Sequence, residues 1–196
     1  YIAKNRSFSE SDRVDYQTIF ARYPGAIASP TASLHFDKNL LNRLKNIGIS
    51  FSFITLHVGA GTFLPIKSDN ISEHKMHFER GMLNRRAAEE INKTKIDGGR
   101  IIPVGTTCLR LIESAAISDK KVSEFDDKTN IFITPGYKFK IADGLITNFH
   151  FPKSTLLMLI SAFVGDRERK RIYKYAIQKQ YRFYSYGDSS LLLPDI

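Results

Sequence analysis

The chain has 196 residues, of which 42% are hydrophobic and 25% charged, and its formal net charge is +9. This composition is typical of a globular domain and excludes a disordered or fibrous chain. There is no run of the roughly 20 apolar residues that a membrane helix needs, and the single cysteine, Cys108, excludes an internal disulfide framework. We therefore expect one cytoplasmic domain. The positive charge indicates either a polyanionic partner such as nucleic acid or only a solvated basic surface.

The first part of the chain combines small residues with one helix and one strand. Residues 25–36 are rich in small side chains, which let a ligand or another element approach the backbone closely. Asp37 is expected to cap an amphipathic helix that ends at Gly48. Residues 52–58 have the β-branched and aromatic content of a strand. The strand leads into the glycine-rich turn 59–62, where backbone amides can face a ligand.

Titratable side chains gather around residues 57–79. His57 ends the expected strand, a position that favours a functional role. Glu73, His74 and His77 are candidates for a metal site, which would make the protein a metal hydrolase. Their spacing is not that of the HExxH motif, and a zinc site needs three or four good ligands. A metal-free polar site is therefore the stronger prediction.

The middle of the chain continues the alternation of helix and strand. An amphipathic helix is expected at 83–95 and a strand at 100–104. The turn 105–107 then leads into a helix whose N-terminus is a candidate anion site. Residues 119–130 are charged and predict a loop, and 131–134 predict a further strand.

The stretch 145–165 is the part of the sequence around which we expect the rest of the chain to be organised. A short apolar strand, 145–147, breaks into a polar loop that contains His150, and Ser154 is a natural N-cap for the helix that follows. That helix is apolar on nearly every face, so we expect it to be buried all round. Burial would hold the loop rigidly at a strand end, where α/β proteins place their chemistry. Flanking phenyl rings would lower the pKa of His150 and favour a neutral base; the alternative is that His150 only holds the loop shape.

The last part of the chain is basic. Residues 167–179 predict a helix whose basic face is either solvated or in contact with phosphates through Lys170, Arg171 and Lys174. The aromatic tail either lines a site or packs as a terminal strand. Strands alternate with helices along the whole chain, which predicts an α/β domain of mostly parallel strands, either open or barrel-like, and incomplete at its N-terminus.

Seven segments, taken together, resemble one family. They are ASPTASLHF at 28–36, TLHVGAGTF at 55–63, EHKMH at 73–77, VGTTCLRLIESAA at 104–116, IFITPGY at 131–137, LITNFHFPKSTLLMLISAF at 145–163 and YRFYSYGD at 181–188. In this order they resemble the S-adenosylmethionine:tRNA ribosyltransferase-isomerase family of queuosine biosynthesis. Three departures are Ser33 in place of a usual Gly, Cys108 in place of a common Ser, and 126–128 in place of a Gly-Trp stretch.

The resemblance implies a function and a domain organisation. Residues 1–196 would be the C-terminal major part of a single α/β catalytic domain, without the N-terminal segment and the inserted β-barrel domain of the family. The enzyme would transfer the ribosyl moiety of S-adenosylmethionine to 7-aminomethyl-7-deazaguanine at the wobble position of a tRNA, and isomerise it to give epoxyqueuosine. Adenine and methionine would be released. S-adenosylmethionine would be the co-substrate, with no metal, and we expect a monomer.

This chemistry needs a base for the ribose carbon beside the sulfonium, an acid for adenine departure and contacts for the co-substrate. The predicted acid/base residues are His57, His77 and His150, in no order. The predicted substrate and cofactor contacts are Gly59, Gly61, Thr106, Thr107, Arg110, Tyr137, Asn148, Lys153, Tyr186 and Asp188. For Arg110 the alternative is a solvent-facing ion pair with Glu113. The alternative for the whole chain is a basic RNA-binding module without catalysis.

Overall fold

The computed structural model describes residue 7 and residues 9–59 and 76–194. The helices are α2 (Asp12–Asp15), the 3-10 helix η1 (Thr31–His35), α3 (Lys38–Asn46), α4 (Arg85–Ile96), α5 (Thr106–Ser114), α6 (Thr155–Val164) and α7 (Asp166–Gln178). The strands are β1 (Thr55–His57), β2 (Glu79–Leu83), β3 (Ala116–Ser118), β4 (Lys121–Val122), β5 (Phe125–Thr129), β6 (Leu145–Asn148) and β7 (Ser189–Leu192). None of the described helices is both long and apolar enough to cross a membrane.

The strands form small antiparallel sheets. One sheet has the order β1-β2-β5, and β3-β4 and β6-β7 are separate two-stranded pairs. The parallel contact within the described residues is an isolated bridge between Val104 and Ile146. The prediction of a mostly parallel sheet, open or closed into a barrel, is therefore wrong.

The direction of the strands follows from the number of helices between them. One helix between two strands returns the chain to its starting side and gives a parallel pair. Between β2 and β5 the chain forms two helices, α4 and α5, and the antiparallel pair β3-β4, which returns it to the same side. Between β6 and β7 it forms two helices, α6 and α7. After two helices the next strand starts from the opposite side and runs antiparallel to the first. Alternation along the sequence indicated the kinds of element but could not give their direction.

Several local predictions are confirmed. The Asp37 carboxylate accepts a hydrogen bond of 2.6 Å from the Leu40 amide at the start of α3. Ser154 Oγ accepts a hydrogen bond of 3.2 Å from the Leu157 amide at the start of α6. No side chain of α6 is exposed, as its apolar sequence predicted. The helix predicted at 167–179 is α7.

Other boundaries differ from the prediction. The charged residues 119–130, expected to form a loop, include β4, which pairs with β3, and β5, which pairs with β2. Antiparallel pairing tolerates the exposed charges of β5 on its solvent face. Residues 131–134 are not a strand, although Ile133 is buried in the core. Leu83 ends β2 and is not part of the following helix. The strand expected at 100–104 contributes only the bridge at Val104.

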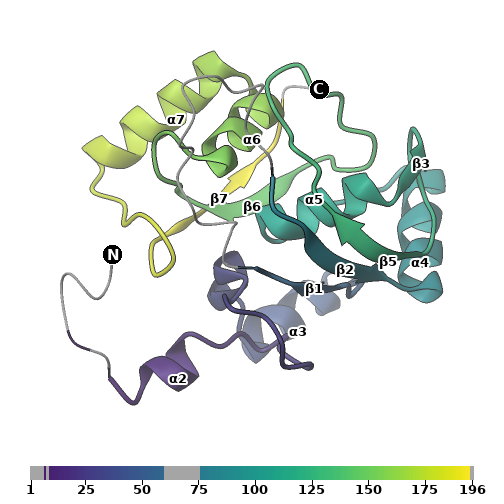
Figure 1. Ribbon diagram of the computed structural model, residues 1–196, viewed down its shortest axis with the longest axis horizontal. Coiled ribbons are helices and arrows are strands. Elements are labelled where there is room, and N and C mark those ends of the chain that lie inside the picture. The colour runs from purple at the N-terminus through teal and green to yellow at the C-terminus, as the bar shows by residue number, and fades with distance from the viewer. Residues whose placement is uncertain (1–6, 8, 60–75, 195–196) are drawn as a thin grey trace.

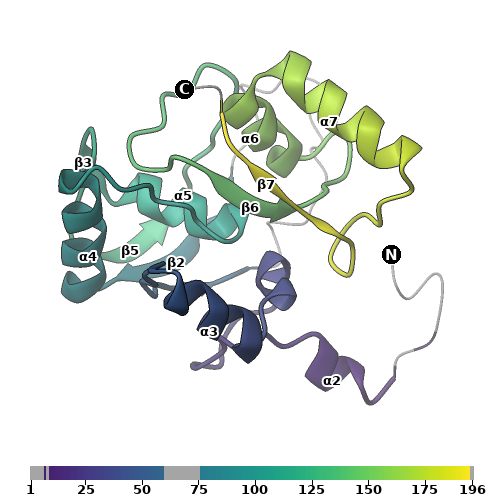
Figure 2. The ribbon, with the colours of Figure 1, turned by 180° about the vertical axis from the view of Figure 1, so that it is seen from behind.

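The helix α5 joins two apolar clusters. In both views it lies between the three-stranded sheet and the β6-β7 pair (Figures 1 and 2). Ile112 belongs to the cluster with Leu83 and Ile91, whereas Leu109 belongs to the cluster around β6 and α6. The two parts of the molecule therefore share one helix, and its N-terminus has a fixed place beside β6.

A buried ion pair fixes α5 to β2. Arg110 Nη1 lies 2.6 Å from Glu79 Oε2, and the two side chains are 3% and 1% exposed. The arginine Nε also donates to the Ile131 carbonyl at 3.3 Å. The alternative interpretation of Arg110, a solvent-facing pair with Glu113, is wrong, because Glu113 is also buried and accepts hydrogen bonds from the backbone amides of residues 140–142. Both residues hold the interior together.

Neutralising Glu79 is expected to destabilise the protein strongly. Glu79→Gln leaves the Arg110 charge buried without its partner, so the free energy of unfolding should fall by about 3–5 kcal/mol. Asp126→Asn is the matched control. It removes the acid of an exposed ion pair whose base, Arg80, lies on β2 beside Glu79. It should cost no more than about 1 kcal/mol. Urea unfolding of the full-length protein measures both, and equal effects would contradict the assigned role of the buried pair.

Candidate active site

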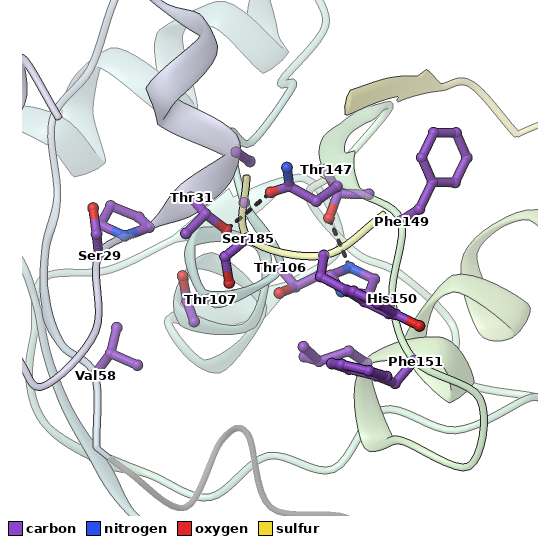
Figure 3. Close-up of a pocket in the computed structure, with 16 residues that line it drawn as sticks. Ser29, Thr31, Val58, Thr106, Thr107, Thr147, Phe149, His150, Phe151 and Ser185 are labelled. Atoms are coloured by element: carbon purple, nitrogen blue, oxygen red, sulfur yellow. Dashed lines mark hydrogen bonds between the residues drawn. The ribbon is translucent and has the colours of Figure 1, made fainter. Parts of the chain in front are cut away.

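A pocket forms where parts of the chain that are distant in sequence come together (Figure 3). It is lined by residues 29–32, Val58, 105–107, 147–151, Leu156 and 184–185. These residues come from the start of η1, the end of β1, the N-terminus of α5, the end of β6 with its loop, and the loop before β7. In Figure 3, Ser29 and Val58 stand on the side opposite His150 and Phe151.

Strand β6 contributes two buried polar side chains, Thr147 and Asn148, which are 2% and 4% exposed. Asn148 Oδ1 accepts a hydrogen bond of 3.0 Å from Thr31 Oγ1, and its Nδ2 donates to the Gly187 carbonyl at 3.3 Å. His35 Nε2 lies 3.0 Å from the same carbonyl. Asn148 thus joins η1, β6 and the loop before β7, and it shapes the pocket wall.

His150 lies two residues after the end of β6 and lines the pocket. Its Nε2 lies 2.9 Å from Thr147 Oγ1, and its backbone amide donates to the Tyr173 hydroxyl at 3.0 Å. Burial lowers the pKa of His150 to about 4. The imidazole is therefore neutral near pH 7, as the flanking rings of the loop predicted. A neutral, oriented imidazole can accept a proton from a bound molecule.

The start of α5 forms the back of the pocket. Gly105, with φ of 99°, is the N-cap and has no side chain with which to cap the helix. Its amide donates to the Ile146 carbonyl at 2.8 Å, which ties the turn to β6. Thr106 and Thr107 follow and line the pocket. Amides of a first helical turn attract negative groups, so this wall is suited to a carboxylate.

An aromatic pair completes the wall beside His150. The rings of Phe151 and Tyr184 are stacked, with centroids 3.6 Å apart and planes at 14°. The Tyr184 backbone is in the left-handed region, with φ of 73°, and its amide donates to the Phe149 carbonyl at 3.0 Å. Non-glycine residues held in this conformation are uncommon and often mark functional sites. The geometry places two aromatic side chains next to the imidazole.

Comparison with known families decides the identity of the chain. A family model described as "Queuosine biosynthesis protein" matches residues 1–192. The chain belongs to the queuosine biosynthesis protein family. The resemblance of the seven sequence segments is thereby confirmed.

Relatives in the queuosine biosynthesis family carry consistent names. A protein of Dinoroseobacter shibae named S-adenosylmethionine:tRNA ribosyltransferase-isomerase is 58% identical over 195 residues, which cover 100% of this chain and 55% of that protein. A protein of the same name from Caulobacter vibrioides is 57% identical, with coverage of 100% and 53%. A crystal structure of S-adenosylmethionine tRNA ribosyltransferase from Thermotoga maritima has a TM-score of 0.69 and 37% identity, covering 83% of this chain and 51% of that chain. The chain spans about half the length of these relatives.

Four of the residues predicted from this queuosine-family sequence line the pocket together. They are Thr106, Thr107, Asn148 and His150. Residues that were not predicted also line it, including Ser29, Thr31 and Ser185. The small-residue stretch 25–36 carried a signal for the first two, because small side chains allow a ligand to approach closely. Ser185 lies in the aromatic tail, in the segment 181–188, for which the lining of a site was one of two alternatives.

The other two candidate histidines lie outside the pocket. His57 is paired with Arg80 across the β1-β2 sheet and borders a separate hollow that also includes Asp126. His77 is exposed. Gly59 follows the pocket residue Val58 but does not itself line the pocket. Gly61, Glu73 and His74 lie outside the described residues.

The remaining predicted contacts have partners within the protein. Arg110 pairs with Glu79, and the Tyr137 hydroxyl donates to Glu113 at 3.2 Å. The Tyr186 hydroxyl donates to Asp12 at 3.3 Å, and Asp188 pairs with Arg182 at 3.0 Å. Arg182 holds Asp188 in its charged form, since hydrogen bonds from the Arg182 backbone and side chain lower the pKa of that carboxyl.

The predicted cations Lys153, Lys170, Arg171 and Lys174 lie outside the pocket. Lys153 is exposed and lies two residues after the pocket residue Phe151. On α7, Lys170 pairs with Asp166 and Arg171 with Glu168, and Lys174 is exposed. Within residues 7, 9–59 and 76–194 no group of three or more His, Cys, Asp or Glu side chains is arranged to hold a metal ion.

Proposed function

We propose that the full-length protein is an S-adenosylmethionine:tRNA ribosyltransferase-isomerase. It would transfer and isomerise the ribosyl moiety of S-adenosylmethionine onto 7-aminomethyl-7-deazaguanine in tRNA, giving epoxyqueuosine and releasing adenine and methionine. The observation that carries this proposal is the 58% identity over 195 residues to a relative with that name. Because the chain spans about half of such relatives, the activity is proposed for the whole protein. Residues 1–196 would form the C-terminal major part of its catalytic domain.

We assign the base of this reaction to His150. The reaction requires removal of a proton from the ribose carbon beside the sulfonium, and a neutral imidazole can take that proton. His150 lines the pocket, and burial keeps it neutral near pH 7. Thr147 would orient the ring through the contact at Nε2. His57 and His77 would then act outside this step.

We assign the co-substrate contacts to the other pocket walls. The first turn of α5, with Thr106 and Thr107, would face the methionine carboxylate. Phe151 and Tyr184 would offer aromatic surface to the sulfonium or to a ring of the substrate. Asn148 would act as a positioning residue, since both ends of its amide bind the protein. The proposed reaction uses no metal, and we propose a cytoplasmic monomer.

The tRNA phosphates would contact α7. This helix carries five basic and two acidic residues, and its basic side chains Lys170, Arg171 and Lys174 are exposed. Helix α7 packs on α6, which follows the pocket loop. A negatively charged backbone bound along α7 would therefore run close to the pocket.

Adenine release tests the proposed reaction directly. The full-length protein, incubated with S-adenosylmethionine and tRNA that carries 7-aminomethyl-7-deazaguanine, should release adenine, and omission of either substrate should abolish the release. His150→Gln should lower turnover about 100-fold or more while S-adenosylmethionine still binds, because a base acts in the transition state. Near-normal turnover in a folded His150→Gln protein would move the base to His57 or His77. No adenine release by the unmodified protein would contradict the function itself.

A triple substitution tests the phosphate contacts. Replacing Lys170, Arg171 and Lys174 by Gln should weaken tRNA binding and flatten its dependence on salt, because fewer counterions are released on binding. Affinity for S-adenosylmethionine should be unchanged. The matched control replaces Arg85, Arg86 and Lys93 of α4, which lie in exposed ion pairs of the same kind. If both triple variants have the same salt dependence, α7 has no special role in tRNA binding.

A further inference from the structure

Two exposed tyrosines stand at the C-terminal end of α7, beside the basic face. Tyr175 is 53% exposed and Tyr181 is 41% exposed. Their ring centroids are 6.4 Å apart, with planes at 47°. Lys174 precedes Tyr175 directly, Lys179 lies two residues before Tyr181, and both lysines are exposed. Exposed aromatic side chains interleaved with cations are typical of surfaces that bind single-stranded nucleic acid.

The backbone between the two tyrosines is constrained. The Gln180 amide donates to the Ile177 carbonyl at 3.1 Å, and the Tyr181 amide donates to the Ala176 carbonyl at 2.9 Å. This is the pattern of a helix that ends in a left-handed residue, a place usually taken by glycine. Gln180 occupies it with φ of 57°. The turn therefore brings Tyr181 back beside Tyr175, even though glutamine is an unfavourable residue type at the left-handed position 180.

The tyrosine pair is connected to the pocket. The Tyr181 ring also contacts the Phe149 ring edge to face, with centroids 5.8 Å apart. Phe149 is buried and lines the pocket, and Figure 3 shows its ring pointing away from Thr106 and Thr107. A continuous line of aromatic side chains thus runs from the surface at Tyr175 to the residue next to His150.

We propose that Tyr175 and Tyr181 form a stacking platform for an unpaired RNA base next to the nucleotide that enters the pocket. Aromatic side chains stack on unpaired bases, and neighbouring lysines bind the phosphates between them. A base-paired helix hides its base faces, so the platform selects single-stranded loops. This inference rests on the proposed tRNA substrate and adds how the loop of that substrate is held. The lysines supply charge, and the tyrosines supply recognition of unstacked bases.

The test is the binding of two short RNAs to the full-length protein. One is a synthetic anticodon stem-loop, and the other is a fully paired duplex with the same number of phosphates. Tyr175→Ala should lower affinity for the stem-loop about 5-fold or more, and affinity for the duplex should change less than twofold. The salt dependence should remain as in the unmodified protein, because no phosphate contact is lost. Tyr175→Phe should retain the affinity, since it keeps the ring.

Two controls make the outcome decisive. Tyr181→Ala should repeat the selective loss, with unchanged binding of S-adenosylhomocysteine as a check that the pocket is intact. Tyr23→Ala removes an exposed ring, 66% exposed, from another part of the chain. It should leave the affinity for both RNAs unchanged. Unchanged stem-loop binding by Tyr175→Ala, equal losses on both RNAs, or an altered salt slope would each overturn the platform. Adenine release by the unmodified protein would then still support the proposed function, whereas selective stem-loop loss without adenine release would support the platform alone.

Discussion

The pocket depends on the position of one short buried strand, β6. Its backbone is held on one side by β7 and on the other by the residues before α5, where the Ile146 amide donates to the Pro103 carbonyl at 3.0 Å. The apolar helix α6 begins at Thr155 and has no exposed side chain. Because the core fixes the chain before and after His150, the loop has little freedom to move. The side-chain amide of Asn148 attaches η1 and the loop before β7 to this strand, and the Gly105 backbone amide attaches the start of α5.

Burial of polar groups serves two purposes in this molecule. In the interior, Arg110 pairs with Glu79 and the Tyr137 hydroxyl donates to Glu113, and burial and the nearby Glu113 charge raise the pKa of Tyr137. These contacts link elements of the interior. At the pocket, the same loss of water lowers the pKa of His150, where a neutral ring is the useful form. The protein thus separates structural charges from a site whose histidine is uncharged.

Much of the local structure could be predicted from the sequence, and most of the long-range structure could not. The caps Asp37 and Ser154 and the burial of α6 depend on neighbouring residues, so they were predictable. Strand direction depends on how pairs of helices pack, and the prediction of parallel strands failed for that reason. The place of His150 beside a pocket could be predicted because its loop lies between two apolar elements. Arg110 was misread because its partner, Glu79, is 31 residues away.

Measuring the protonation state of His150 is the most direct test of the proposed site. Nuclear magnetic resonance of the full-length protein, with the His150 signals assigned by their loss in His150→Gln, can follow the ring from pH 8 to pH 3.5. A base in a water-poor pocket should titrate near pH 4, and its signals should shift when S-adenosylhomocysteine is added at pH 7. A titration at the ordinary value of about 6.5, with signals unaffected by the ligand, would contradict the placement of the reaction at this pocket.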